Sequence, residues 1–296
     1  NILVTASSPE LIGLGSELVK RGHEVLVMIW DQPEYLARNL RVGRWMTKRI
    51  MRNFNHLMRG CRAAAVISEN MQKNYSRTYG LRCEVIRHGI APRRRSDRTS
   101  CRDVIRIVFA GSLYSKVEWN AFVAALESVD WKLANRYIEL TFIGRFPLAG
   151  AVRPDRVNYH PQVDNSAALE MMASMDIGYI PYWFDSGHAD VVATSFPGKV
   201  TAYAASGLVI FHHAPEYSSV RSFFSRFPFG VVCSSYDPKV ICKELLFLFL
   251  SIDEAETHQA RESAMRECLS ESAMIDAFLR LLIIGRSKSE NVFPRY

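Results

Sequence analysis

Residues 195–210 read SFPGKVTAYAASGLVI, and this stretch decides the fold. Pro197 and Gly198 predict the start of a helix, Gly207 predicts its end, and the apolar residues that follow are typical of a buried strand. Lys199 is thereby placed at the positive end of a helix dipole, where a lysine is electrostatically unfavourable unless an anion binds beside it. The segment therefore predicts either a bound diphosphate or a solvated lysine at a frayed helix end.

Strands and helices alternate along the rest of the chain in two blocks. In the first block we expect strands at 2–6, 25–30, 63–67 and 84–87, and helices at 9–21, 44–60 and 69–79. In the second we expect strands at 105–110, 138–143, 157–159, 177–181 and 208–211, and helices at 119–129, 167–175, 199–206, 238–251 and 258–282. Strands that end in glycine before a helix favour two doubly wound α/β domains that face each other across a cleft.

The domain boundary is expected where the composition changes, at residues 91–102, which are rich in Pro, Ser, Thr and Arg. The prediction is an N-terminal domain over 1–95 and a second domain over 103–285, whose last helix crosses back to the first. The chain opens directly inside an apolar strand, so we expect the N-terminal domain to be incomplete. On the first helix, we expect Leu11, Leu14, Leu18 and Val19 to form the buried face.

Composition places the chain among ordinary folded proteins. Of its 296 residues, 48% are hydrophobic and 23% charged, which excludes disorder, collagen and coiled coil as the dominant state. The longest apolar run, around residues 245–250, is far too short to span a bilayer. The six cysteines show no C-x-x-C spacing and suit a reducing cytosol. The net charge of +7 favours an anionic partner.

A second candidate phosphate-binding segment follows the first strand of the second block. Gly111, Ser112 and Leu113 come directly after this strand, where a small residue lets the backbone approach a phosphate at the next helix N-terminus. Lys116 could add a positive charge. The alternative is a glycine that only makes a tight turn.

Several segments occur in an order known from one fold family. They are 108–113, 140–144, 157–163, 173–182 and 195–210. Together they resemble the donor domain of GT-B glycosyltransferases, especially the family 4 type, and the resemblance covers about 105–283. It extends back through 66–71 and 85–90, which look like the exit from the acceptor domain.

The resemblance implies sugar transfer from a nucleotide diphosphate-sugar, with UDP favoured, to a hydroxyl of a lipid-linked or growing glycan. It implies no bound cofactor, and it places Gln162, Tyr182, Gly198 and Lys199 at nucleotide-contacting positions. One departure matters, because Thr194 and Ala202 occupy the positions of the Glu-x7-Glu pair of retaining enzymes. Alternatives are a retaining transferase, a nucleotide-sugar epimerase and a non-catalytic GT-B partner subunit.

Two residues are predicted to be catalytic by similarity to inverting exopolysaccharide enzymes, such as the glucuronosyltransferase of xanthan assembly. Asp31 follows a buried strand, where a carboxylate can deprotonate an acceptor hydroxyl. His88, followed by Gly89, matches the His-Gly of that enzyme type. The alternatives are a helix cap or turn residue for Asp31 and a core or turn histidine for His88.

The helix expected at 44–60 is basic and amphipathic. Its apolar face is formed by Met46, Ile50, Phe54, Leu57 and Met58, with Trp45 at the edge. Its basic residues are Arg44, Lys48, Arg49, Arg52 and Arg59. Such a helix either lies in an anionic membrane surface or packs on the sheet of its own domain. We expect a cytoplasmic protein, peripheral on the inner face of the plasma membrane.

Metal and nucleic-acid binding are poorly supported. The chain has no Asp-x-Asp motif, and His188, His212 and His213 lack Cys or carboxylate partners at ligand spacing. No RRM, KH or helix-turn-helix pattern accompanies the basic segment, so we expect no nucleic-acid partner.

Overall fold

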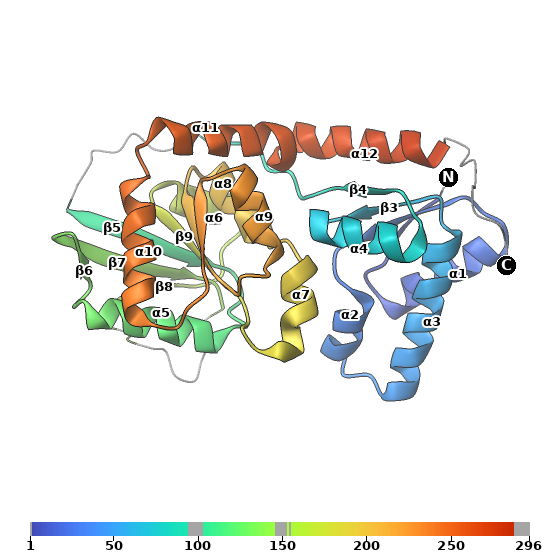
Figure 1. The fold of residues 1–296 in the computed structure, drawn as a ribbon, viewed down its shortest axis with the longest axis horizontal. Helices are drawn as coiled ribbons and strands as arrows, with labels where there is room; N and C mark the ends of the chain where they lie inside the picture. The colour runs from blue at the N-terminus through green and yellow to red at the C-terminus, as the bar shows by residue number, and fades with distance from the viewer. Residues whose placement is uncertain (1, 94–102, 146–152, 154, 287–296) are drawn as a thin grey trace. The chain divides into compact units, whose positions relative to one another are not determined.

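The computed structural model describes residues 2–93, 103–145, 153 and 155–286, and it divides the chain into two compact units (Figure 1). Unit 1 comprises Asn1–Arg87 and Met274–Tyr296, and unit 2 comprises His88–Ala273. The boundary precedes the expected one near residue 95, because Ile90 N donates to Leu269 O and Arg93 N donates to Ala205 O. These bonds tie the start of the predicted linker to unit 2, and residues 94–102 of that linker lie outside the described residues.

Unit 1 is built on a parallel sheet with strand order β1-β2-β3-β4. Its strands are β1 (Ile2–Thr5), β2 (Val25–Ile29), β3 (Ala63–Val66) and β4 (Cys83–Val85). Its helices are α1 (Pro9–Lys20), α2 (Pro33–Asn39), α3 (Arg44–Gly60), α4 (Glu69–Tyr79) and α12 (Glu271–Arg286). Every residue of β2 is buried, as expected for an apolar run covered on both faces of a parallel sheet.

Helix α12 packs on one face of the unit 1 sheet. Ala277 and Leu281 join Leu26 and Met28 of β2 in one buried cluster. The sequence predicted a single helix over 258–282, and this is wrong, because α11 (Ala255–Ala264) and a π-helical turn (Met265–Leu269) end at an extended Ser270. The Ser270 hydroxyl accepts a hydrogen bond from Ala273 N, so Ser270 caps the start of α12 as short polar side chains commonly do.

The buried face of α1 differs from the expected one. Leu11 and Leu14 are 37% and 52% exposed, whereas Ile12 and Gly15 are buried. Gly15 faces Leu57 of α3 at a distance that leaves little room for a Cβ atom. The close approach of α3 therefore selects the small-residue face of α1, and the leucine face remains outside.

Unit 2 contains a larger, mainly parallel sheet of order β11-β10-β9-β5-β7-β6, with β8 also paired to β7. Its strands are β5 (Val104–Ala110), β6 (Lys132–Leu133), β7 (Arg136–Ile143), β8 (Val157–His160), β9 (Ile177–Pro181), β10 (Val209–His213) and β11 (Gly230–Cys233). Its other helices are α5 (Lys116–Ser128), α6 (Asn165–Ala173), α7 (Ala189–Thr194), α8 (Gly198–Ala205), α9 (Ser219–Arg226) and α10 (Pro238–Leu250). Only β6 pairs antiparallel among the described strands.

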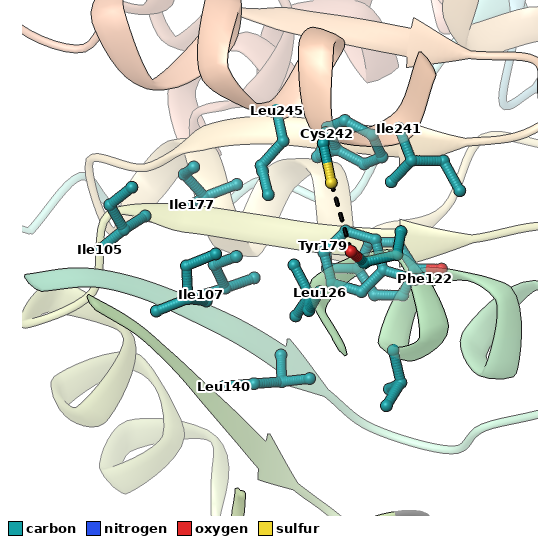
Figure 2. Packing of buried hydrophobic residues seen from close by; sticks show 14 of the residues in the cluster. Ile105, Ile107, Phe122, Leu126, Leu140, Ile177, Tyr179, Ile241, Cys242 and Leu245 are labelled. Carbon is teal, nitrogen blue, oxygen red and sulfur yellow. Dashed lines mark hydrogen bonds between the residues drawn. The ribbon is translucent and has the colours of Figure 1, made fainter. Parts of the chain in front are cut away.

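One face of the unit 2 sheet is covered by α5 and α10 (Figure 2). Tyr179 of β9 stacks on Phe122 of α5 with ring centroids 4.0 Å apart. Cys242 of α10 donates from Sγ to Ala125 O of α5 at 3.3 Å, which joins the two helices. Because neighbouring strand residues point to opposite faces, Gly178 faces the other side of the sheet, where it meets α8.

No described helix is both long enough and apolar enough to cross a membrane.

Candidate functional site

The predicted donor-site residues of unit 2 centre on Lys199, in the first turn of α8. Its Nζ lies 5.2 Å from the ring centroids of both Phe109 and Tyr114. A Cβ atom added to Gly111 would lie 3.4 Å from this Nζ, so the lysine reaches back to the carboxyl end of β5. Helix α8 begins at Gly198, directly after Pro197, and its N-terminus has no side-chain cap. Its first turn thus brings Lys199 against the loop that follows β5.

Lys199 is a partly buried cation. Burial lowers the pKa of its ammonium group from 10.5 to about 8, and no nearby carboxylate opposes this shift. Within the described part of the chain, no Asp or Glu oxygen forms an ion pair with Nζ. A desolvated charge without a counter-ion is costly. The structure thus places Lys199 in partly buried surroundings, and the ligand of this lysine stays a prediction.

Tyr203 holds α8 in place. The spacing Lys199–Tyr203 puts both side chains on one helix face, one turn apart. The Tyr203 hydroxyl accepts a hydrogen bond from Ala110 N at 2.9 Å and donates to Tyr179 O. Its ring lies where any Cβ on Gly178 would be, so β9 needs glycine there. The tyrosine of the motif therefore positions the helix that carries Lys199.

The loop after β5 brings two glycine backbones together. Gly111 has φ +110°, a conformation that favours glycine, and its N–H donates to Ile143 O at 2.7 Å. A Cβ on Gly144, at the end of β7, would collide with Gly111 O. Close backbone packing thus requires glycine at position 144, and the positive φ favours glycine at position 111, which remains exposed beside Lys199.

The helix that follows this loop begins earlier than the sequence predicted. We expected it at 119–129, and α5 begins at Lys116, so Gly111 and Ser112 lie closer to a helix start than expected. Ser112 is exposed, and Leu113 is half-buried against the core. Ser115 ties this loop to β9, because its hydroxyl donates a hydrogen bond to Pro181 O at 2.9 Å.

The remaining predicted donor-site residues differ in their surroundings. Tyr182 is buried directly after β9, and its ring lies 6.2 Å from that of Tyr114. Gly198 is exposed, with nothing within 4 Å of an added Cβ. Gln162 is exposed in the loop after β8, and Lys116 is exposed at the first position of α5. Tyr182 is thus linked to Lys199 through Tyr114, while the roles of these residues stay predictions.

An aromatic stack next to Lys199 was not singled out from the sequence. Tyr114 stacks on Trp183 at 4.6 Å, and Trp183 stacks on His188 at 4.3 Å with nearly parallel rings. The His188 Nδ1 is held 2.9 Å from both carboxylate oxygens of Asp185. The signal that could have revealed it is the aromatic run that continues past Pro181 at the carboxyl end of a strand.

Glu118 anchors the loop that carries Trp183. This carboxylate is buried in the first turn of α5. It accepts hydrogen bonds from Phe184 N at 3.0 Å and from the Tyr236 hydroxyl at 2.7 Å. Two donors from distant segments therefore converge on one carboxylate.

We expect Glu118→Ala to lower the free energy of unfolding by about 1–3 kcal/mol, because it leaves the Phe184 N–H without its acceptor. Urea unfolding measures this loss. Glu118→Gln keeps an oxygen acceptor and should lose less. Equal losses for both variants would show that the hydrogen bonds to Glu118 contribute little.

The paired histidines of β10 have structural partners. His212 Nδ1 donates to Ile180 O and its Nε2 accepts from the Ser218 hydroxyl, and burial lowers its pKa to about 3. His213 Nε2 donates to Ser235 O. Within the described residues, no group of three or more His, Cys, Asp or Glu side chains is arranged to hold a metal ion.

The two predicted catalytic residues lie in different units. Asp31 is exposed in the bend between β2 and α2, where partial desolvation by surrounding protein atoms raises the pKa of its carboxyl group. It does not cap α2, whose N-cap is Gln32. His88 is exposed, so the core-histidine alternative is wrong. Thr194 occupies one of the two positions where retaining enzymes carry Glu. Its hydroxyl donates a hydrogen bond to Asp190 O within α7.

The chain forms two α/β units, each built on a mainly parallel sheet, and this is the architecture of the GT-B fold. Comparison with solved structures shows the GT-B fold over nearly the whole chain. Sucrose-phosphate synthase from Thermosynechococcus elongatus aligns over 95% of this chain and 73% of its own, with a TM-score of 0.67 at 13% identity. WaaG, a glycosyltransferase involved in lipopolysaccharide biosynthesis, aligns over 93% and 81%, with a TM-score of 0.56 at 12% identity. Anabaena HepE, solved with UDP and glucose, aligns over 96% and 75%, with a TM-score of 0.55 at 14% identity.

At these identities the likeness concerns the fold, and the predicted α/β GT-B class is confirmed. No family model matches the chain, and no curated protein matches it.

Proposed function

We propose that this protein is a glycosyltransferase that takes a sugar from a nucleoside diphosphate-sugar, with UDP as the favoured nucleotide. The observation that carries the proposal is Lys199, a desolvated ammonium group that has no counter-ion among the described residues and lies beside an exposed glycine backbone. A diphosphate supplies the missing negative charge. Neighbours that share the fold include a synthase named as UDP-forming and a structure with bound UDP, which supports this nucleotide.

In the proposed reaction, the bond between the sugar and the diphosphate breaks and negative charge grows on the departing diphosphate. Lys199 and the α8 N-terminus would stabilise this charge, as fixed positive groups do when charge develops in a transition state. The open space at Gly198 gives the diphosphate room at that helix end. The Tyr114–Trp183 pair offers a flat aromatic face for the nucleobase.

Asp31 is proposed as the general base that deprotonates the acceptor hydroxyl. Its raised pKa makes its ionised form a better proton acceptor than that of an ordinary aspartate. We propose an inverting reaction, because the carboxylate pair of retaining enzymes is replaced by Thr194 and Ala202. The proposed acceptor is a lipid-linked or growing glycan, and His88 is proposed to contact the reacting sugars.

The direct test is a screen of nucleotides by thermal shift, followed by an assay of donor hydrolysis and transfer. A nucleotide at 100 times its Kd stabilises the protein by about 2.7 kcal/mol, so the correct one should stand out. UDP binding with no turnover on any UDP-sugar would favour a non-catalytic GT-B subunit. If no nucleoside diphosphate stabilises the protein, the proposal is wrong.

The affinity for UDP should depend on pH through Lys199. Its pKa is about 8 in the free protein, and a bound diphosphate raises it because the charged form is favoured beside an anion. Below pH 8 the lysine is already protonated, so the Kd should be flat. From about pH 8 to 9 the Kd should rise by up to tenfold, because binding then requires proton uptake.

Calorimetry at pH 7, 8 and 9 in buffers of different ionisation enthalpy measures both the Kd and the protons taken up. The terminal phosphate of UDP has a pKa near 6 and is almost fully ionised from pH 7 to 9, so it adds little to the change in Kd. A Kd that does not change between pH 7 and 9 would argue against a diphosphate on Lys199.

A further inference from the structure

The connection between α2 and α3 exposes large apolar side chains. Leu40, the C-cap residue directly after α2, is 50% exposed, and Trp45, in the first turn of α3, is 69% exposed. Both helices extend away from the unit 1 sheet, and their connection lies at the far end (Figure 1). We call residues 40–52 the α2–α3 corner.

The same corner is strongly basic. Its exposed cations are Arg41, Arg44, Lys48, Arg49 and Arg52. The sequence contains no Asp or Glu between Tyr35 and Ser68. Among the described residues, none of these cations forms an ion pair, and the Arg49 guanidinium lies 5.7 Å from the Trp45 ring. The corner therefore presents uncompensated positive charge around an exposed indole.

The inner face of α3 is already occupied. Ile50, Phe54, Leu57 and Met58 are at most 2% exposed, because they pack within unit 1. Of the two alternatives for this helix, its apolar face packs within its own unit and is not available to a membrane. Any surface contact of α3 has to use its outer, N-terminal part.

We propose that the α2–α3 corner docks unit 1 on an anionic lipid bilayer. The cations would contact phosphate and carboxylate head groups, while Trp45 and Leu40 would enter the interfacial layer, where tryptophan is commonly enriched. Charge alone would equally suit nucleic acid. The exposed leucine beside the tryptophan favours lipid, since an aliphatic side chain gains from leaving water and has no partner among phosphates. The proposal does not depend on sugar transfer.

The charge part is tested by co-sedimentation of the whole protein with vesicles of phosphatidylcholine and phosphatidylserine. Each basic residue near an anionic surface strengthens binding about fivefold, so Lys48→Gln, Arg49→Gln and Arg52→Gln together should weaken it roughly 100-fold. The matched control removes three other exposed charges, by Lys73→Gln, Arg77→Gln and Lys239→Gln. Equal losses in both variants would show that only net charge matters, which would overturn the proposal.

The apolar part is tested by Leu40→Ser with Trp45→Ser. We expect at least about a tenfold weaker partition, since two large side chains no longer leave water. The matched control is Phe247→Ser with Leu250→Ser, which are 65% and 62% exposed on α10 and should change nothing. Melting curves check that both variants fold.

A second measurement reports contact directly. Brominated lipids should quench the wild-type fluorescence more than that of Trp45→Phe, because the other tryptophans lie elsewhere. Equal quenching would overturn the proposal. A second result would also overturn the proposal: duplex RNA or DNA displaces the vesicles from the wild-type protein, and the Leu40→Ser and Trp45→Ser variant still binds vesicles normally. The α2–α3 corner would then be assigned to nucleic acid.

Discussion

Replacing Asp31 with asparagine should lower the rate of sugar transfer by about 10²–10⁴-fold, the usual contribution of a general base. The base acts in the transition state, so the Kd for UDP should be unchanged. Asp31 is exposed and does not cap α2, so the free energy of unfolding should change by less than about 0.5 kcal/mol. Transfer kinetics and calorimetry on the same preparation measure these quantities.

The pH dependence of transfer gives an independent check. Asp31 must be ionised to accept a proton, so the wild-type rate should fall as the pH drops through its raised pKa. Asp31→Asn should lose this decline. Glu34→Gln removes another exposed carboxylate nearby and should transfer sugar normally. Near wild-type transfer by Asp31→Asn would show that Asp31 is only a turn residue.

Replacing Lys199 with methionine should change binding and stability in opposite directions. The Kd for UDP should rise by about 10- to 150-fold, equal to the roughly 1.5–3 kcal/mol of a hydrogen bond to a charged group. Without nucleotide, the free energy of unfolding at pH 7 should increase by about 1–3 kcal/mol, because the folded protein no longer has to desolvate an ammonium group.

The sign of the stability change follows from proton linkage. The pKa of Lys199 is about 8 in the folded protein and near 10.5 when unfolded, so the charged form is disfavoured by folding. The cost is complete below pH 8 and disappears as the pH rises towards 10.5. The gain from Lys199→Met should shrink over the same range. Lys239→Met, at an exposed position of α10, should change neither property. A folded Lys199→Met variant with unchanged UDP affinity would remove Lys199 from the donor site.

The local features of the fold were predictable because they depend on neighbours in the chain. Glycine, proline and short polar residues mark helix ends through backbone geometry that is fixed within a few residues. The sequence therefore placed α3 and α4 at their observed bounds, and β9 at Ile177–Pro181. The ordered strands and helices predicted two doubly wound α/β domains, and the GT-B class was implied by the resemblance of segments 108–113, 140–144, 157–163, 173–182 and 195–210 to that family.

The same local signals did not decide which face of a helix is buried. Leu11 and Leu14 satisfy helical periodicity as well as Ile12 does, and only the approach of α3 at Gly15 leaves them outside. The apolar stripe of α3 was compatible with a membrane or a sheet. Burial of Phe54 and Leu57 inside unit 1 decided this.

By itself, the sequence determined that Lys199 is placed at a helix start and that Tyr203 follows one turn later. It left open whether this lysine is solvated, because burial depends on residues that are distant in the chain. The parallel pairing of β5 with β9 places Phe109, Gly111 and Tyr114 against α8, about 90 residues further along. Desolvation is a property of all surrounding atoms, so only the tertiary structure could show that Lys199 is a partly buried cation with a lowered pKa.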